Sequence, residues 1–242
     1  MRTKIWAHRG ASEYAPENTL EAFSLAVSQG ADGVELDVQL SADGEIVVIH
    51  DEWIDRVSDG SGWVRDYTLK ELKSFRFQKT HPEYQDARIP TLREVYELLK
   101  PTDLEINVEL KTGIVPYPGL TQKVWQLGRE MDMNDRIWYS SFRHQSVLEL
   151  KATAPEARTG FLYQDGYMGM PEYALKYGVM ALHPALYLMQ DEAAVRECRD
   201  RGICLHVWTV NEPEHIRMLA SYGVEAVITN RPDVAVQVIG HL

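Results

Sequence analysis

The chain has 242 residues, of which 45% are hydrophobic, which is enough for one sizeable α/β domain. It carries 36 acidic and 25 basic residues, a formal net charge of −11, which argues against nucleic acid or an anionic membrane as a general partner. A small anionic substrate stays compatible with this charge, because a bound cation and a few basic side chains can reverse the field locally.

Nothing in the sequence has the pattern of a membrane span or a signal peptide. No apolar run reaches the roughly 18 residues that a spanning helix needs, and the first ten residues, MRTKIWAHRG, contain no apolar core. The two cysteines, Cys198 and Cys204, lack any metal-type spacing and are typical of ordinary thiols in a reducing compartment. We therefore expect a cytoplasmic protein with no membrane partner.

Short apolar strands alternate with amphipathic helices along almost the whole chain. Strands are expected at 4–8, 33–40, 104–110, 136–141, 157–162, 178–183, 203–210 and 225–229. Helices are expected at 20–30, 91–100, 119–132, 144–153, 190–201 and 212–222, with a last helix that begins near Asn230 and Asp233. Asn18 or Thr19 is placed to cap the first helix, and Thr91 with Glu94 has the spacing of a capping box.

Eight strands joined by helices predict an α/β fold of the TIM (β/α)₈ barrel type. An open doubly wound sheet is the competing topology, but it rarely needs eight units, and the sequence has no GxGxxG fingerprint. We predict a single domain over residues 1–242.

One stretch departs from this alternation. After the second strand, SADGEIVVIHD is typical of a hairpin, with Asp43-Gly44 as the turn and EIVVIH as the returning strand. Residues from about 51 to 90 then contain no clear βα unit. We expect a small insertion on the rim of the barrel, after strand 2.

Carboxylates and apolar residues alternate in two of the predicted strands. In GVELDVQL, Glu35 and Asp37 share one face, because successive strand side chains point to opposite sides. In LEINVELK, Glu109 and Lys111 share the polar face in the same way. Buried carboxylates are costly unless they are paired or bind a metal. The pattern therefore indicates either a divalent-cation site, with Mg²⁺ or Ca²⁺ favoured by oxygen ligands, or a salt-bridge network with Lys111 and Arg9.

Two histidines follow predicted strands near these carboxylates. His8 ends the first strand and His50 ends the returning hairpin strand. Histidine can give and take a proton near neutral pH, so the two are candidates for general acid and base. Arg9 offers a planar fork for a phosphate or a carboxylate, the alternative being a surface ion pair.

Several blocks of sequence together resemble the glycerophosphodiester phosphodiesterase family. The blocks are HRG (8–10), APENT (15–19), GADGVELDVQLSADGEIVVIHD (30–51), IPTL (89–92), NVELK (107–111), SSF (140–142), VWTVN (207–211) and ITNRPD (228–233). Each block alone is a weak signal, whereas their order and their spread over nearly the whole chain are highly specific.

The resemblance implies roles for individual residues. A divalent metal, usually Mg²⁺ or Ca²⁺ with Mn²⁺ as an option, would be held by Glu35, Asp37 and Glu109. His8 and His50 would be the general acid and base, and Arg9 and Lys111 would contact the phosphate.

Three further residues in the blocks are candidates for weaker roles. Glu17 would support the site by a hydrogen bond to Arg9 or His8. Trp208 would floor the pocket at the glycerol end and Phe142 would line the substrate channel, the alternative for Trp208 being plain core packing. For Asn18 we favour helix capping, and for His183 a structural role.

The resemblance implies hydrolysis of a small-molecule glycerophosphodiester, such as glycerophosphocholine or glycerophosphoethanolamine, to sn-glycerol 3-phosphate and an alcohol. It favours attack by the glycerol 2-hydroxyl through a cyclic phosphate over direct attack by water. The competing functions are a lysophospholipase-D-like phosphodiesterase of the same superfamily and a catalytically silent barrel that binds phosphodiesters. The sequence does not assign which histidine is the acid and which is the base, nor the head-group preference or the oligomeric state.

Overall fold

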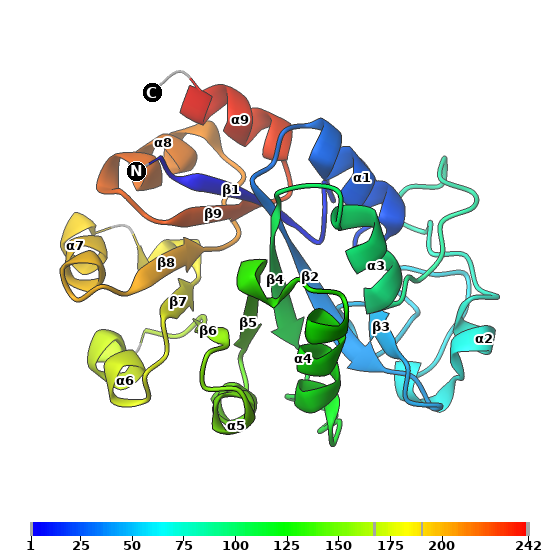
Figure 1. The fold of residues 1–242 in the computed structure, drawn as a ribbon. Coiled ribbons are helices and arrows are strands. Elements are labelled where there is room, and N and C mark those ends of the chain that lie inside the picture. Colours follow the sequence, from blue (N-terminus) through cyan, green and yellow to red (C-terminus); the bar gives the residue numbers. More distant parts are fainter. Residues whose placement is uncertain (1, 167, 190, 241–242) are drawn as a thin grey trace.

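Eight parallel strands form a closed ring with helices around it in the computed structural model, which describes residues 2–166, 168–189 and 191–240 (Figure 1). The strands of the ring are β1 (Lys4–His8), β2 (Gly33–Leu40), β4 (Glu105–Leu110), β5 (Ile137–Ser141), β6 (Arg158–Tyr163), β7 (Ala181–Pro184), β8 (Cys204–Val207) and β9 (Ala226–Thr229). Because β1 pairs in parallel with both β2 and β9, the sheet has no open edge in the ring. The predicted TIM barrel is confirmed.

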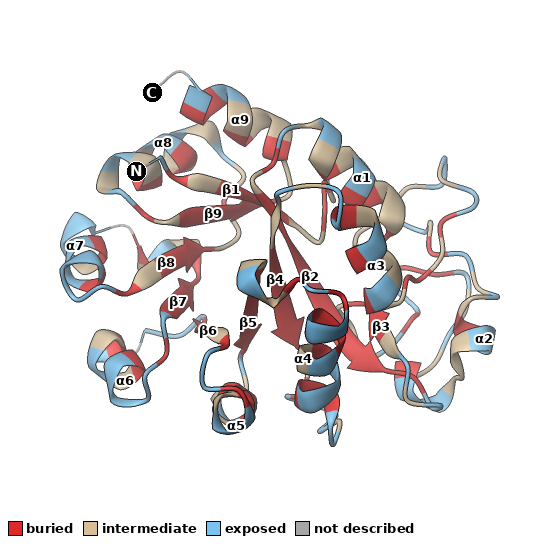
Figure 2. Cartoon of the chain, viewed as in Figure 1, coloured by how far each residue is buried: buried red, intermediate tan, exposed pale blue. Residues whose placement is uncertain are grey.

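Helices between the strands cover the outside of the barrel. They are α1 (Leu20–Ser28), α3 (Leu92–Leu99), α4 (Leu120–Glu130), α5 (His144–Thr153), α6 (Met170–Lys176), α7 (Glu192–Asp200), α8 (Pro213–Tyr222) and α9 (Pro232–Gly240). Figure 2 shows the strands buried and the helices exposed on their outer sides. The expected capping box is present, since Thr91 accepts from the Glu94 amide and Glu94 accepts from the Thr91 amide.

The apolar face of each strand packs beneath these helices. Val34, Leu36 and Val38 of β2 are fully buried in the main core, together with apolar residues of α1 and α3. The alternate residues of β2 therefore face the interior of the barrel. This alternation brings Glu35 and Asp37 to the inside.

The hairpin and the segment after it lie to one side of the ring. β3 (Ile46–Val48) pairs antiparallel with β2, and the following residues contain the 3₁₀ turn η1 (Val64–Asp66) and the short helix α2 (Leu69–Leu72). This part of the chain is on the right in Figure 1. It has a small core of its own, which includes Ile54 and Leu72, both fully buried. Further 3₁₀ turns are η2 (Asn134–Arg136) and η3 (Leu186–Leu188).

Two strands begin or end three residues away from their predicted bounds, whereas the other strands of the ring differ by at most one residue. The strand expected at 178–183 is β7, which begins only at Ala181, because Gly178 has a positive φ of 64° and ends α6. The strand expected at 203–210 is β8, which ends at Val207. The helix α6 was missed, since its seven residues are too few to give a clear helical period.

Two histidines fill part of the barrel interior. His183 of β7 and His206 of β8 are fully buried, and the His206 Nδ1 and His183 Nε2 atoms lie 3.0 Å apart. The rings of Trp6 and Trp138 lie 4.3 and 4.7 Å from that of His206. Burial lowers the pKa of His183 to about 3, so its ring is neutral in the folded protein near neutral pH.

The buried neutral His183 makes stability depend on pH. An unfolded histidine titrates near pH 6.5, so the stabilisation is fully present above about that pH and is lost as the pH falls towards about 3. Between about pH 5.5 and 4, the free energy of unfolding of His183→Gln should fall less steeply than that of the wild type, by about 1.4 kcal/mol per pH unit. Urea unfolding at a series of pH values measures this, and equal slopes would contradict it.

Candidate active site

Three carboxylates from two neighbouring strands meet inside the barrel. Asp37 of β2 is paired with Glu109 of β4 in the strand register, and Glu35 lies two residues before Asp37 on the same face. One oxygen of each carboxylate lies within 4.8 Å of the others, and all three residues are buried. The sequence predicted this convergence from the period-2 pattern, and the parallel register supplies it.

Positive charge near these carboxylates only partly balances them. The Lys111 Nζ atom lies 3.1 Å from Glu109 Oε1, and the Arg9 Nε atom lies 3.4 Å from Asp37 Oδ2. Glu35 accepts from the Arg9 backbone amide at 3.0 Å. The salt-bridge network that the sequence left open is therefore present, but it offers two side-chain cations to three buried carboxylates.

The pKa values of the carboxyl groups follow this imbalance. Burial and the charges of Asp37 and Glu109 raise the pKa of Glu35 well above its usual range. Burial also raises the pKa of Glu109, against the opposing effect of Lys111. Burial would raise the pKa of Asp37 too, but nearby His50, Arg9 and Lys111 hold it below its usual range.

The three carboxylates fit a hard divalent cation. The Oδ1 atom of Asp37 is buried and has no hydrogen-bond partner among the described residues, which leaves one acceptor free to ligate. The set offers only oxygen ligands, which suits Mg²⁺ or Ca²⁺ better than Zn²⁺. A cation here would supply the positive charge that Arg9 and Lys111 do not.

His8 stands at the end of β1, beside Glu35. Its Nδ1 atom lies 2.6 Å from Asn230 Oδ1, an acceptor, so Nδ1 carries the proton and Nε2 is left unprotonated in the neutral ring. The Nε2 atom lies 3.9 Å from Glu35 Oε2. Burial, followed by the charge of Arg9, lowers the pKa of His8 to about 4.

His50 follows β3 and reaches the same pocket from the hairpin. Its Nδ1 atom donates to Asp51 Oδ1 at 2.6 Å, which orients the ring and leaves Nε2 for other partners. The hydrogen bond from His50 lowers the pKa of Asp51, and a second one from Arg56 adds to the effect. Both histidines are thus held through Nδ1, one by an amide and the other by a carboxylate.

Arg56 connects the two sides of the site. Its Nε atom donates to Asp51 Oδ2 at 2.6 Å, and its two terminal nitrogens donate to the two oxygens of Glu17, both at 2.7 Å. Glu17 in turn accepts from Arg9 NH1 at 2.9 Å. The Arg56 guanidinium therefore fixes both Asp51, the partner of His50, and Glu17, the partner of Arg9.

Sequence reasoning gave no site role to Arg56, Asn230 or Asn107, and it assigned Asn18 to helix capping. Thr19 caps α1, whereas Asn18 turns inward with a φ of 58° and donates to Asp37 Oδ2 at 2.9 Å. Asn adopts a positive φ more readily than Thr, and this preference is the one sequence signal that separates Asn18 from Thr19. Glu17 accepts hydrogen bonds from Arg9 and Arg56, so it supports Arg9 as the sequence predicted.

Part of this group lines one hollow of about 160 Å³ at the C-terminal ends of the strands, whereas Asp37, Lys111 and Glu17 are not among its lining residues. Its lining includes His8, Arg9, Glu35, Asn107, Glu109 and His50, with Phe142, Leu162, Gln164, Trp208 and Ile228 on the remaining wall. The rings of Phe142 and Trp208 meet edge to face at 5.5 Å. The Trp208 Nε1 atom donates to the His183 carbonyl at 2.8 Å, which fixes the indole as part of the wall.

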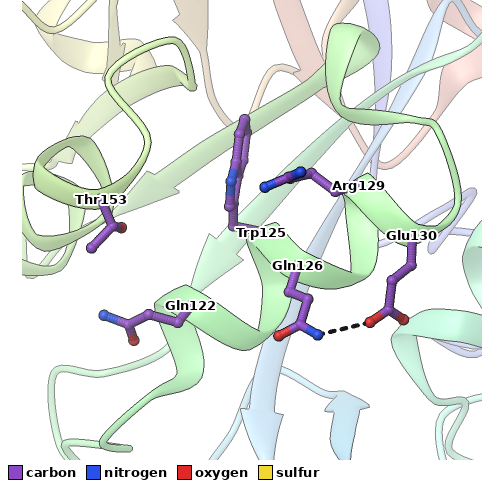
Figure 3. Close-up of a pocket in the computed structure, with 6 residues that line it drawn as sticks. All are labelled: Gln122, Trp125, Gln126, Arg129, Glu130 and Thr153. Carbon is purple, nitrogen blue, oxygen red and sulfur yellow. Dashed lines mark hydrogen bonds between the residues drawn. The ribbon is translucent and has the colours of Figure 1, made fainter.

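A larger hollow of about 540 Å³ lies on the outer surface, away from this chemistry. Figure 3 shows its wall, made by α4 residues and Thr153 of α5. Gln126 donates to Glu130 at 2.9 Å there. No member of the carboxylate and histidine group reaches it, so the candidate site is the smaller hollow.

Comparison with known proteins agrees with this geometry. Residues 8–234 match the Glycerophosphoryl diester phosphodiesterase family. The chain belongs to this family. It is 40% identical over 240 residues to a glycerophosphodiester phosphodiesterase of Caldanaerobacter subterraneus subsp. tengcongensis, with 99% of this chain and 98% of the relative covered. A relative of that description from Bacillus altitudinis is 36% identical, with 98% of each chain covered.

Solved structures give the same result. An Oleispira antarctica phosphodiesterase in complex with the product sn-glycerol-3-phosphate superposes with a TM-score of 0.88, at 30% identity, covering 99% of this chain and 97% of that one. A glycerophosphodiester phosphodiesterase of Agrobacterium tumefaciens str. C58 has a TM-score of 0.86 at 30% identity, covering 97% of this chain and 99% of that one.

Within the described residues, no helix is both long and apolar enough to cross a membrane.

The bridging position of Arg56 can be tested directly. Arg56→Met removes the donors to Asp51 and Glu17, so His50 and Arg9 lose their fixed orientation while the carboxylates stay in place. Loss of such a supporting contact typically costs about 10-fold to 100-fold in activity. Steady-state kinetics should show the loss mainly in kcat, with Arg76→Met, an exposed arginine of the same segment, close to wild type. Equal effects of the two substitutions would refute the role of Arg56.

Proposed function

We propose that the protein hydrolyses glycerophosphodiesters to sn-glycerol 3-phosphate and an alcohol in a reaction that depends on a divalent metal. The chain is a phosphodiesterase by family. The observation that carries the finer proposal is the hollow lined by His8, His50, Glu35 and Glu109, with Asp37 grouped closely with the two glutamates behind it. In support, a neighbour of known structure was solved with sn-glycerol-3-phosphate. A cytoplasmic location remains part of the proposal, with Cys198 and Cys204 as free thiols.

Glu35, Asp37 and Glu109 would hold the cation. A bound Mg²⁺, Ca²⁺ or Mn²⁺ would supply Lewis-acid chemistry and orient the phosphodiester. Arg9 and Lys111 lie beside the carboxylates and stabilise the negative charge that builds on the phosphoryl oxygens. Trp208 and Phe142 form part of the apolar side of the hollow.

His8 and His50 carry the proton transfers. Each ring is held through Nδ1, so each offers Nε2 to a reacting oxygen. One histidine takes the proton of the attacking hydroxyl group onto Nε2, and the other, which is protonated at Nε2 beforehand, gives that proton to the leaving alkoxide. When the attacking group is the glycerol 2-hydroxyl, water then opens the cyclic phosphate with the two roles reversed, which restores both protonation states. An alkoxide is a poor leaving group, so the second transfer is needed for a natural alcohol.

The division between metal ligands and histidines predicts two kinds of variant. Glu109→Gln should lose metal affinity and activity together, by more than the roughly 10-fold to 100-fold typical of changes around a metal's ligands. His8→Ala and His50→Ala should keep the metal and lose about 10²-fold to 10⁴-fold in kcat. Metal titration and turnover, measured on each variant, separate these outcomes.

A substrate with a good leaving group distinguishes the two histidines. The variant that lacks the acid should recover activity on a p-nitrophenyl ester of glycerol phosphate, because that leaving group needs no proton, whereas the variant that lacks the base should not recover. If both alanine variants kept most of their activity on glycerophosphocholine, the acid–base proposal would be wrong.

Metal dependence is tested first on the wild-type protein. Protein stripped of metal should release no glycerol 3-phosphate from glycerophosphocholine, and Mg²⁺, Ca²⁺ or Mn²⁺ added singly should restore release. Recovery with one ion establishes the reaction and names the cation. Undiminished turnover by stripped protein would contradict the metal dependence, and no release with any ion, from folded protein, would favour another phosphodiester or a binding role.

A further inference from the structure

A second hollow lies next to the candidate active site at the mouth of the barrel. It has a volume of about 630 Å³ and is lined by the last two residues of β6 and by residues that follow β5 and β6. Phe142, Leu162 and Gln164 line both this hollow and the catalytic one, so the two are contiguous. We call it the mouth groove and define it by Phe142, His144, Tyr163, Asp165, Met168 and Tyr173.

The size of the catalytic hollow leaves part of the substrate outside it. Its 160 Å³ equals the liquid volume of about five water molecules, at about 30 Å³ each. We expect the glycerol phosphate group to occupy this small hollow, so that the esterified alcohol extends beyond it. The mouth groove is the adjoining hollow that shares lining residues on the Phe142 side.

Aromatic rings form much of the groove. Phe142 is 42% exposed, which leaves part of its ring available to a ligand. The His144 ring stacks on Phe161 at 4.2 Å and lies 5.6 Å from the ring of Tyr173. Aromatic faces attract organic cations, quaternary ammonium groups above all.

The charges of the groove have one sign. Asp165 is an exposed lining residue, and the described residues that line the groove include no lysine or arginine. His144 donates through Nε2 to the Leu162 carbonyl at 2.9 Å, and burial lowers the pKa of its ring, so it adds no positive charge near neutral pH. The groove thus combines aromatic rings, one carboxylate and no cation.

We propose that the mouth groove is the subsite for the leaving alcohol and that it selects alcohols with an ammonium group, of the choline and ethanolamine type. This inference rests on the proposed phosphodiesterase function and adds a substrate preference to it. Asp165 attracts the cation, and the rings of Phe142 and Tyr173 contact it. The strand-end residues bind the glycerol phosphate common to all such substrates.

Paired substrates test the preference. Wild-type kcat/KM should be higher for glycerophosphocholine than for glycerophosphoglycerol, whose alcohol is neutral. Asp165→Asn and Tyr173→Leu should each raise KM about threefold to tenfold for the cationic substrate, as expected for one exposed ion pair or ring contact, and leave the neutral one unchanged. Tyr173→Phe should behave as wild type, because the ring is kept.

Two controls isolate the groove. Glu156→Gln removes an exposed carboxylate before β6, at the opposite end of the barrel, and should change neither substrate. Inhibition by glycerol 3-phosphate, which lacks the alcohol, should be equal in all variants.

Three results would overturn the subsite. They are equal wild-type kcat/KM for both substrates, equal effects of the variants on both, and an effect of Tyr173→Leu on lysophosphatidylcholine alone, which would assign the groove to an acyl chain. Failure of the metal-loaded protein to hydrolyse any glycerophosphodiester is a different result, because it removes the proposed function itself.

Discussion

The repulsion between three buried carboxylates is the constraint on which the site depends. Asp37 and Glu109 face each other across two paired strands, and Glu35 lies beside them. Such groups are stable in the interior only when they are neutralised, protonated or bound to a cation. Arg9 and Lys111 supply part of the charge, and burial together with the charges of Asp37 and Glu109 still raises the pKa of Glu35. A bound metal would supply the remaining positive charge that the three carboxylates need.

The barrel holds these carboxylates together because its strands are rigid and their register is fixed. A one-residue slip of β4 would move Glu109 to the outer face, beneath the helices. The strands also separate two interior environments. Near the C-terminal ends the inward side chains are charged and line the hollow, whereas His183, His206 and the two tryptophans pack as neutral groups elsewhere in the ring. Stability and chemistry therefore use different residues of the same strands.

Local pattern and parallel pairing were enough to predict most of the fold and the carboxylates. The period-2 alternation placed Glu35, Asp37 and Glu109 on the inside, and barrel geometry brings strand ends together. The partners that orient the histidines were beyond such reasoning. Asn230 lies 222 residues from His8 in the chain, and Arg56 belongs to a segment without periodicity, so neither contact has a local signal. The residue at which β8 ends could not be predicted either, because apolar residues continue past Val207.

The placement of these residues implies a division of labour between strands and loops. Groups that would act on the phosphate stand at or near strand ends, where backbone hydrogen bonds fix them. Phe142, Asp165 and Tyr173 of the mouth groove belong to the segments after β5 and β6, which can change without altering strand register. Arg56 connects the segment after β3 to the candidate active site through Asp51 and Glu17. A substitution in that segment can therefore disturb the histidine and arginine of the site, whereas a substitution in the mouth groove leaves these contacts in place. Substrate preference can therefore vary at the groove while the carboxylates and histidines stay as they are.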